Sequence, residues 1–255
     1  MIILKSAAEV AKIGAAGAIL ADCLDMLSAE AGPGVTTAQL DQAAEEFIRR
    51  RGGVPTFLGY QGFPGSICAS PNDMVVHGIP GPYQIVEGDI MSLDVGVTLD
   101  GYIADSAVTL PIGRVGLEDQ RLLAVTAESL EAGLAECIAG RRLGDISHAV
   151  QEVVEAAGLS VVRSLVGHGV GREMHEDPQI PNYGEPGRGP RLEEGMVFAI
   201  EPMVNVGAHE VYVAEDGWAI STSDGSFSAH FEHSVAVGKK TPRVLTRRRS
   251  ESGHG

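Results

Sequence analysis

The dipeptide Asp100-Gly101 lies between two long apolar runs, and this hairpin signal constrains the fold more than any other feature of the chain. The runs span residues 89–98 and 102–110. Asp-Gly between two such runs is typical of a two-residue turn that joins antiparallel strands. A turn of this kind also determines which residues face each other across the two strands.

The register of this hairpin brings two carboxylates together. Asp94 lies opposite Ala107, so Asp105 is its diagonal neighbour on the same face, about 7–8 Å away at Cα. Neither strand contains Lys or Arg, and most flanking residues are apolar. Two ionised carboxylates there would cost on the order of several kcal/mol in desolvation and repulsion. The pair alone leaves two explanations open, a divalent metal ion between the carboxylates or a solvent-facing position on an edge strand.

The remaining pattern indicates two halves with the same order of elements, helices followed by strands. The predicted helices span residues 6–30, 37–51, 117–139 and 144–157, and the later strands span about 159–166, 195–206 and 228–237. Because the strands are segregated from the helices, the sequence predicts an α+β fold with a pseudo-symmetric duplication.

Two glutamates occupy distinctive places in the predicted strands. Glu201 ends an apolar run directly before Pro202, which indicates a strand end or bulge that redirects a side chain. Glu232 shares the polar face of its predicted strand with His230 and Ser234. A lone Glu in a strand is usually solvated, so neither glutamate identifies a site by itself.

Three histidines have contrasting surroundings. His168 is flanked by Gly167 and Gly169, which lets the backbone approach whatever the imidazole contacts. His175 lies in a polar segment, whereas His77 lies in an apolar loop. A His in an apolar loop is more often a satisfied core residue than a catalyst.

The acidic composition and the cysteines exclude several function classes. The net charge is −15, from 34 acidic and 19 basic side chains, which disfavours a nucleic-acid-binding role. The three cysteines are widely separated, so we expect no disulfide framework and a reducing cytoplasm. No apolar run approaches the roughly 18 residues of a membrane span. We therefore expect a cytoplasmic protein with neither a membrane nor a specific nucleic-acid partner.

Residues 239–255 have the opposite charge balance. They carry six basic groups against a single acidic one and contain few apolar side chains. Such a segment is typical of a solvated chain end. We expect one domain over residues 1–238 and a flexible basic tail over 239–255, whose removal should leave activity intact. A basic tail also suits a transient contact with the ribosome.

Taken in order, the candidate residues resemble the motifs of the methionine aminopeptidases, in the short bacterial form called type I. Five residues stand in the ligand order and the local contexts of that family, and these are Asp94, Asp105, His168, Glu201 and Glu232. The run from Asn72 to Pro80 matches as well, and the resemblance extends over residues 2–238. Only 31 residues separate the last two ligands, which leaves no room for the helical insertion of type II enzymes. The resemblance implies the duplicated α+β "pita-bread" fold and a single catalytic metallopeptidase domain.

The resemblance also implies two divalent metal ions, which we expect to be Mn, Fe(II), Co or Zn. Asp105 and Glu232 would bridge the two ions, and Asp94 would chelate one of them. His168 and Glu201 would bind the other. Four carboxylates balance the charge of two such ions, which favours the metal explanation of the aspartate pair.

The implied reaction is hydrolysis of the first peptide bond in the two-metal mode. Glu201 would also act as the general base, and His77 and His175 would contact the scissile amide and stabilise the tetrahedral intermediate. The pocket for the methionine side chain would be lined by Tyr60, Phe63, Cys68 and Trp218. Phe57 and Met174 stand where Cys and Phe are common in bacterial relatives, which leaves the volume of the pocket open.

The implied substrates are peptides and nascent proteins that begin with Met followed by a small residue, and we expect a monomer. The first alternative is a proline-specific aminopeptidase or dipeptidase of the same fold, although such enzymes usually carry a long N-terminal domain. The second alternative is a non-catalytic, ribosome-associated binding module. Such modules typically lose metal ligands, and none is lost here.

Overall fold

The central hairpin forms as the sequence predicts. In the computed structural model, β4 (Ile90–Leu99) and β5 (Tyr102–Pro111) pair along their whole length, with Asp94 opposite Ala107. The two residues of the Asp100-Gly101 turn have positive φ angles, 49° and 73°, as a two-residue hairpin turn of the mirror-image type requires. The register that brings the two aspartates together is therefore confirmed.

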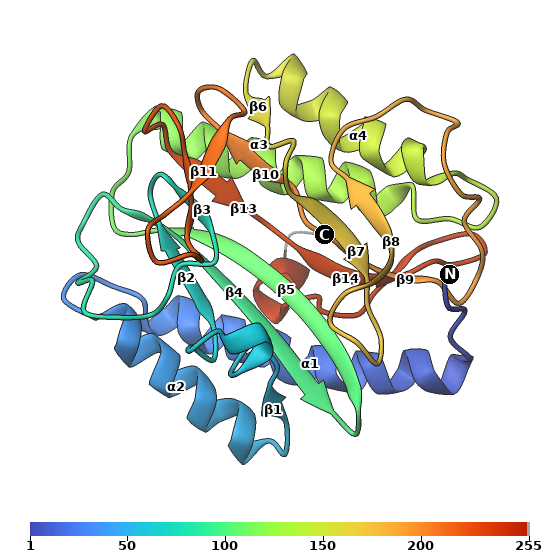
Figure 1. Cartoon of the computed structure of the whole chain (residues 1–255), viewed down its shortest axis with the longest axis horizontal. Coiled ribbons are helices and arrows are strands. Elements are labelled where there is room, and N and C mark those ends of the chain that lie inside the picture. Colours follow the sequence, from blue (N-terminus) through green and yellow to red (C-terminus); the bar gives the residue numbers. More distant parts are fainter. Residues whose placement is uncertain (254–255) are drawn as a thin grey trace.

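Four long helices lie in two pairs, one in each half of the chain. They are α1 (Ala7–Glu30), α2 (Thr37–Arg50), α3 (Leu117–Ala135) and α4 (Leu143–Ala156). The first two helices begin with capping boxes, in which Ser6 and Thr36 accept hydrogen bonds from the backbone three residues later. Figure 1 shows the pair α1 and α2 below the strands and the pair α3 and α4 above them. All four helices agree with the predicted ranges to within a few residues.

The other strands are short, and the structure describes residues 1–253. The strands are β1 (Val54–Pro55), β2 (Cys68–Pro71), β3 (Met74–Val76), β6 (Ser160–Val161), β7 (Val166–Gly169), β8 (Glu176–Pro181), β9 (Val197–Ile200), β10 (Met203–Asn205), β11 (Val211–Val213), β12 (Ile220–Thr222), β13 (Ser228–His230), β14 (His233–Ala236) and β15 (Arg243–Val244), with 3₁₀ turns at Tyr60–Gly62 and Arg249–Gly253.

Within the described residues these strands form a four-stranded sheet around the hairpin, a five-stranded sheet in the order β15-β14-β9-β7-β8, and the three-stranded sheets β13-β10-β6 and β11-β12-β3. The order of helices followed by strands occurs twice, which confirms the duplicated α+β arrangement. Over the same residues, none of the helices has the length and apolar character needed to cross a bilayer.

Two predicted strands are interrupted at the candidate glutamates. The strand predicted over 195–206 is β9 and β10, with Glu201 and the following proline between them. The strand predicted over 228–237 is β13 and β14, with Glu232 in the gap. A proline lacks the N–H that a ladder needs, and the N–H of Glu232 instead donates to the carbonyl oxygen of Ala107 over 2.9 Å. Each glutamate therefore lies at a break rather than within a strand.

The basic segment at the end of the chain packs against the helices. β15 pairs with β14, and Leu245 lies so close to α1 that a Cβ on Gly17 would collide with the Leu245 carbonyl oxygen. Leu245 is 7% exposed, and Thr246 is fully buried. Arg247 forms an ion pair with Glu131 of α3. The segment is therefore packed against the rest of the molecule, and its apolar contact comes from the pair Val244-Leu245, which is flanked by basic residues.

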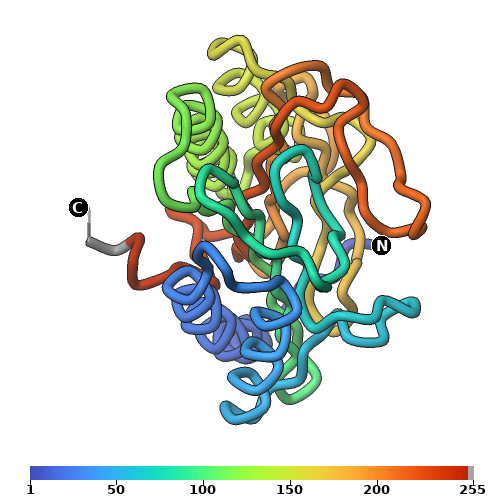
Figure 2. The backbone as a smooth tube through the Cα atoms, turned by 90° about the vertical axis from the view of Figure 1, so that its left-hand side faces the viewer, coloured from blue at the N-terminus to red at the C-terminus, as the bar shows by residue number. Residues whose placement is uncertain are grey.

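The flexible tail predicted over residues 239–255 therefore does not hold for residues 243–253. Figure 1 shows the 3₁₀ turn of this segment next to α1, and Figure 2 shows the segment running past α1 before its last turn projects from the surface. The charge balance obscured the short apolar run Val244-Leu245, whose burial offsets the cost of ordering the chain. Residues 254–255 lie outside the described residues.

We expect Leu245→Ala to lower the free energy of unfolding by about 2–4 kcal/mol, because truncation of a buried Leu loses apolar burial and leaves a cavity. Urea unfolding followed by circular dichroism measures the change. Leu117→Ala is the matched control, since Leu117 is 85% exposed, and it should change this free energy by less than about 0.5 kcal/mol. An equally small effect of Leu245→Ala would restore the flexible-tail prediction.

Candidate active site

A cavity of about 280 Å³ collects every candidate residue that the sequence identifies. Its lining includes the five candidate ligands, the two candidate catalytic histidines and the six pocket residues, namely Asp94, Asp105, His168, Glu201, Glu232, His77, His175, Tyr60, Phe63, Cys68, Trp218, Phe57 and Met174. None of the lining residues is Lys or Arg. The cavity therefore combines carboxylates and imidazoles with an apolar wall.

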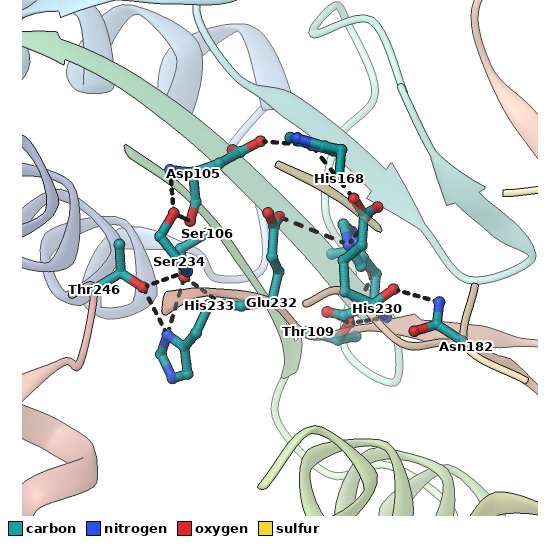
Figure 3. A network of polar contacts seen from close by, with 12 residues as sticks. Asp105, Ser106, Thr109, His168, Asn182, His230, Glu232, His233, Ser234 and Thr246 are labelled. Atoms are coloured by element: carbon teal, nitrogen blue, oxygen red, sulfur yellow. Dashed lines mark hydrogen bonds and ion pairs between the residues drawn. The ribbon is translucent and has the colours of Figure 1, made fainter. Parts of the chain in front are cut away.

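The five candidate ligands come from both halves of the chain. Asp94 and Asp105 lie on the hairpin of the first half. His168 lies on β7 and Glu201 directly follows β9, the two strands being neighbours in the five-stranded sheet. Glu232 directly precedes β14, which pairs with β9 on its other side. The site therefore exists only where the hairpin and the five-stranded sheet meet, as Figure 3 shows for three of these residues.

The carboxylates are buried beside one another without a cation from the protein. Asp105 is 3% exposed and Glu232 1% exposed. Asp94 is half-buried, but β4 has strands paired on both of its sides and one oxygen of each aspartate is buried, which excludes a solvent-facing edge position for the pair. Burial raises the pKa of Asp94 to about 7. Burial, together with the neighbouring carboxylates, raises the pKa values of Asp105, Glu201 and Glu232 well above their ordinary values. One oxygen each of Asp94, Asp105 and Glu232 is buried without a hydrogen-bond partner.

His168 faces this acidic group with an unprotonated nitrogen. Its Nδ1 lies 2.9 Å from the carbonyl oxygen of Gly169, which can only accept, so Nδ1 donates and Nε2 of the neutral ring carries the lone pair. Burial lowers the pKa of His168 to about 4. Nε2 is 3.8 Å from an oxygen of Asp105 and 3.5 Å from one of Glu201. A lone pair facing two carboxylate oxygens is repelled unless a cation lies between them.

These residues fit a divalent metal ion. Asp105, His168 and Glu232 each offer one ligand atom, and the three atoms lie within 4.8 Å of one another. Carboxylate oxygens with one imidazole nitrogen suit the hard and borderline divalent ions. A cation would satisfy the unpartnered oxygens and remove the repulsion together. The group is therefore a buried metal-binding group made of Asp, His and Glu.

His230 belongs to the site, although the sequence interpretation assigned it no role. It is 2% exposed, and its Nε2 has no hydrogen-bond partner. That nitrogen is 3.9 Å from an oxygen of Glu201 and equally far from one of Glu232. Burial lowers its pKa to about 3, so the ring is neutral. The signal was available, because strand alternation already placed His230 on the same face as Glu232.

The other two histidines lie within the same cavity. The Nδ1 of His175 is 2.8 Å from the Tyr60 hydroxyl, and its ring centroid is 4.4 Å from that of His168. His77 directly follows β3 and has a φ of 62°, a left-handed conformation that is uncommon outside glycine and often found at functional sites. Burial lowers the pKa values of His77 and His175. Both rings therefore favour the neutral form.

The apolar wall of the cavity consists of packed side chains. The rings of Phe63 and Trp218 meet edge to face with their centroids 5.1 Å apart. Cys68 is buried, and burial raises the pKa of its thiol, which makes it a neutral, polarizable surface. Phe57 and Met174 are buried in the same lining. The wall is thus shaped for an apolar side chain.

We expect Glu232→Gln to raise the unfolding temperature of the chelator-treated protein, by an amount that grows from about pH 5 to about pH 8. Because the folded-state pKa of Glu232 lies well above 4.5, its stabilising contribution is present at low pH and is lost as the pH rises. Glutamine does not ionise, so the variant does not lose this stability as the pH rises. Thermal unfolding across this pH range measures the difference, and Glu215→Gln, an exposed residue, is the control. A pH-independent difference would contradict the buried-charge interpretation.

Comparison with known proteins places the site in a family. The model of "Metallopeptidase family M24" matches residues 11–239. "Methionine aminopeptidase 1" of Bacillus subtilis is 51% identical over 247 residues, which cover 97% of this chain and 100% of that protein. "Methionine aminopeptidase" of Clostridium acetobutylicum is 50% identical over 96% of this chain and 99% of its own length.

Solved structures agree with these matches. The crystal structure of methionine aminopeptidase from Thermotoga maritima has a TM-score of 0.95 and 43% identity, over 97% of this chain and 100% of that chain. The prolidase from Pyrococcus furiosus, at 19% identity and a TM-score of 0.78 over 66% of its length, shares the fold alone. The predicted pita-bread fold is confirmed. The chain belongs to metallopeptidase family M24 and, within that family, to the methionine aminopeptidases.

Proposed function

We propose that this chain removes the N-terminal methionine from peptides and nascent proteins by metal-dependent hydrolysis, with a preference for a small second residue. The observation that carries the proposal is the buried group of Asp105, His168 and Glu232, whose ligand atoms converge without a protein cation. The adjoining apolar wall and the full-length similarity to methionine aminopeptidases support the same function.

Five residues would hold two divalent ions in this proposal, and they are Asp94, Asp105, His168, Glu201 and Glu232. Asp105 and Glu232 are the candidates to bridge the ions, since both are deeply buried and both keep an unpartnered oxygen. The ions would be Mn, Fe(II), Co or Zn. When bound, they supply Lewis-acid polarisation and a lowered pKa of water, which provides a nucleophile at neutral pH.

Glu201 is the candidate general base. Its oxygens lie 3.5 Å from Nε2 of His168 and 3.9 Å from Nε2 of His230, and its side chain is 14% exposed. It can therefore accept the proton of the attacking water and deliver it to the leaving amine. The neutral rings of His168 and His230 add no positive charge of their own beside this carboxylate.

The remaining two histidines are proposed to orient the peptide bond. The Tyr60 hydroxyl lies 2.8 Å from Nδ1 of His175. In the proposed mechanism it donates to that nitrogen, so Nε2 of the ring keeps its proton and donates to the substrate carbonyl oxygen. His77, held at a left-handed φ, offers a second neutral imidazole to the scissile amide. Tyr60 thus selects the tautomer on which His175 depends.

The apolar wall is proposed to bind the methionine side chain. Phe63 and Trp218 present aromatic edges, and Cys68 presents a polarizable sulfur, which together suit a thioether. Phe57 and Met174 lie in the same lining, and we propose that their bulk sets the depth of the pocket. The wall carries no charge that would favour a polar first residue.

The alternatives receive less support. A proline-specific peptidase rests on a likeness of fold alone, at 19% identity. A non-catalytic module is disfavoured because all five ligand residues are retained.

We propose a cytoplasmic monomer that acts on nascent chains. Two of the basic side chains that could contact the ribosome already form ion pairs within the chain, Arg247 with Glu131 and Arg249 with Asp22. This leaves less positive charge available for a ribosome contact.

Chelator-treated protein should release no methionine from the peptide Met-Ala-Ser, and Mn(II), Fe(II) or Co(II) should restore release, because the buried carboxylates need a cation. Chromatography of the products measures the rate. Ala-Pro is the comparison substrate and should be cleaved at least about tenfold more slowly, since it leaves the apolar wall unfilled. Failure of these three metals and of Zn(II) would contradict the proposed function, and faster cleavage of Ala-Pro would favour the proline-specific alternative.

Glu201→Gln should lower kcat for Met-Ala-Ser by about 10²–10⁴-fold, because an amide cannot accept the proton of the attacking water. Steady-state kinetics at saturating Mn(II) measures the loss. Glu215→Gln, which changes an exposed carboxylate in the same way, should leave kcat unchanged. Turnover retained by Glu201→Gln would remove Glu201 from the mechanism.

A further inference from the structure

A buried polar network behind the metal-binding group connects both halves of the chain to its C-terminal segment (Figure 3). Its hydroxyl groups belong to Ser106 of β5, Ser234 of β14 and Thr246, which follows β15. All three residues are fully buried. No solvent is therefore at hand to replace a lost partner, so each of these hydrogen bonds constrains the groups that it joins.

Two of the hydroxyls tie the backbone of Asp105 to the segment that carries Glu232. The N–H of Asp105 donates to Ser234 Oγ over 2.9 Å, and Ser234 Oγ donates to the carbonyl oxygen of Asp105 over 2.8 Å. Ser106 Oγ donates to the carbonyl oxygen of Glu232. Because Asp105 and Glu232 both offer ligand atoms to the metal-binding group, these bonds set the separation of two ligand-bearing backbones.

Thr246 supports this connection from the C-terminal segment. Its Oγ1 accepts the N–H of Ser234 over 3.1 Å and lies 2.9 Å from Nδ1 of His233. The Thr246 hydroxyl proton can then go to Nδ1, which leaves the Nε2 proton of His233 facing Glu251 at 3.3 Å. One threonine side chain thus holds two consecutive residues of β14, directly after Glu232.

We propose that Thr246 is a positioning residue for the metal ligands, so that the C-terminal segment supports the metal site through this one side chain. The inference rests on the proposed function, because it takes Asp105 and Glu232 to bind metal. Thr246 does not line the cavity and lies beyond the end of the family match. Its influence passes through the hydrogen bonds of the network, so it acts on ligand spacing and not on the substrate.

Thr246→Val tests the proposal, because it keeps the shape of the side chain and removes the hydroxyl. Calorimetric titration of the chelator-treated, full-length protein with Mn(II) should give an affinity at least about tenfold weaker than that of the unaltered protein. At saturating Mn(II), kcat for Met-Ala-Ser should fall while KM stays within about twofold. Thr246→Ser, which keeps the hydroxyl, should restore most of the affinity.

Ser250→Ala is the matched control from the same segment. It removes a hydroxyl that bonds to Asp25 over 2.7 Å and lies outside the network, so the Mn(II) affinity should not change. A lower unfolding temperature of Thr246→Val with an unchanged Mn(II) affinity would make Thr246 merely structural and overturn the inference. Unaltered protein that binds none of Mn(II), Fe(II), Co(II) and Zn(II) would overturn the proposed function itself, a result that the variants cannot mimic.

Ser106→Ala provides a second test if Thr246→Val does not fold. It removes the hydroxyl that donates to the Glu232 carbonyl oxygen and so weakens the same connection from the side of β5. An affinity for Mn(II) at least about tenfold weaker would support the inference. An unchanged affinity would overturn it.

Discussion

Four carboxylates converge where the two halves of the chain meet, and the surrounding elements hold them there. Asp105 and Glu232 come from segments that are far apart in the chain, yet both exchange hydrogen bonds with the opposite segment. Bringing their carboxylates together is unfavourable without a cation, as their raised pKa values indicate. In the metal-free fold these groups are therefore costly to ionise, and a bound divalent ion would offset that cost. A cluster this costly persists only because the surrounding structure holds it in place.

The elements around the cluster can be understood as supports for it. The hairpin holds two aspartates in register. Glu201 and Glu232 lie at breaks between strands, and both line the cavity. Each helix pair covers one half with an apolar core. The C-terminal segment adds Thr246 behind the ligands. The same buried hydroxyls therefore serve both stability and the proposed metal site, because they join the two halves of the chain and set the distance between the ligand-bearing backbones.

Much of the site could be predicted because its determinants are local. Turn chemistry at Asp100-Gly101 set the hairpin register, and strand alternation placed His230 beside Glu232. Other features depend on atoms that are distant in the sequence. The unpartnered Nε2 of His230 is evident only when its neighbours are known. The packing of Leu245 on α1 was missed because charge composition dominates in a segment that has only two apolar side chains together.

The hairpin and the order of helices and strands follow from turn preferences and periodicity, which act over short stretches of sequence. The candidate ligands follow from the resemblance of ordered motifs to those of a known family. The burial of the carboxylates, the direction of the His168 lone pair and the packing of the basic segment depend instead on contacts between distant parts of the chain. The physical reason is that desolvation, charge repulsion and hydrogen-bond satisfaction are properties of a three-dimensional neighbourhood. The surroundings of the site are formed by residues from both halves of the chain, so no single stretch of sequence specifies them.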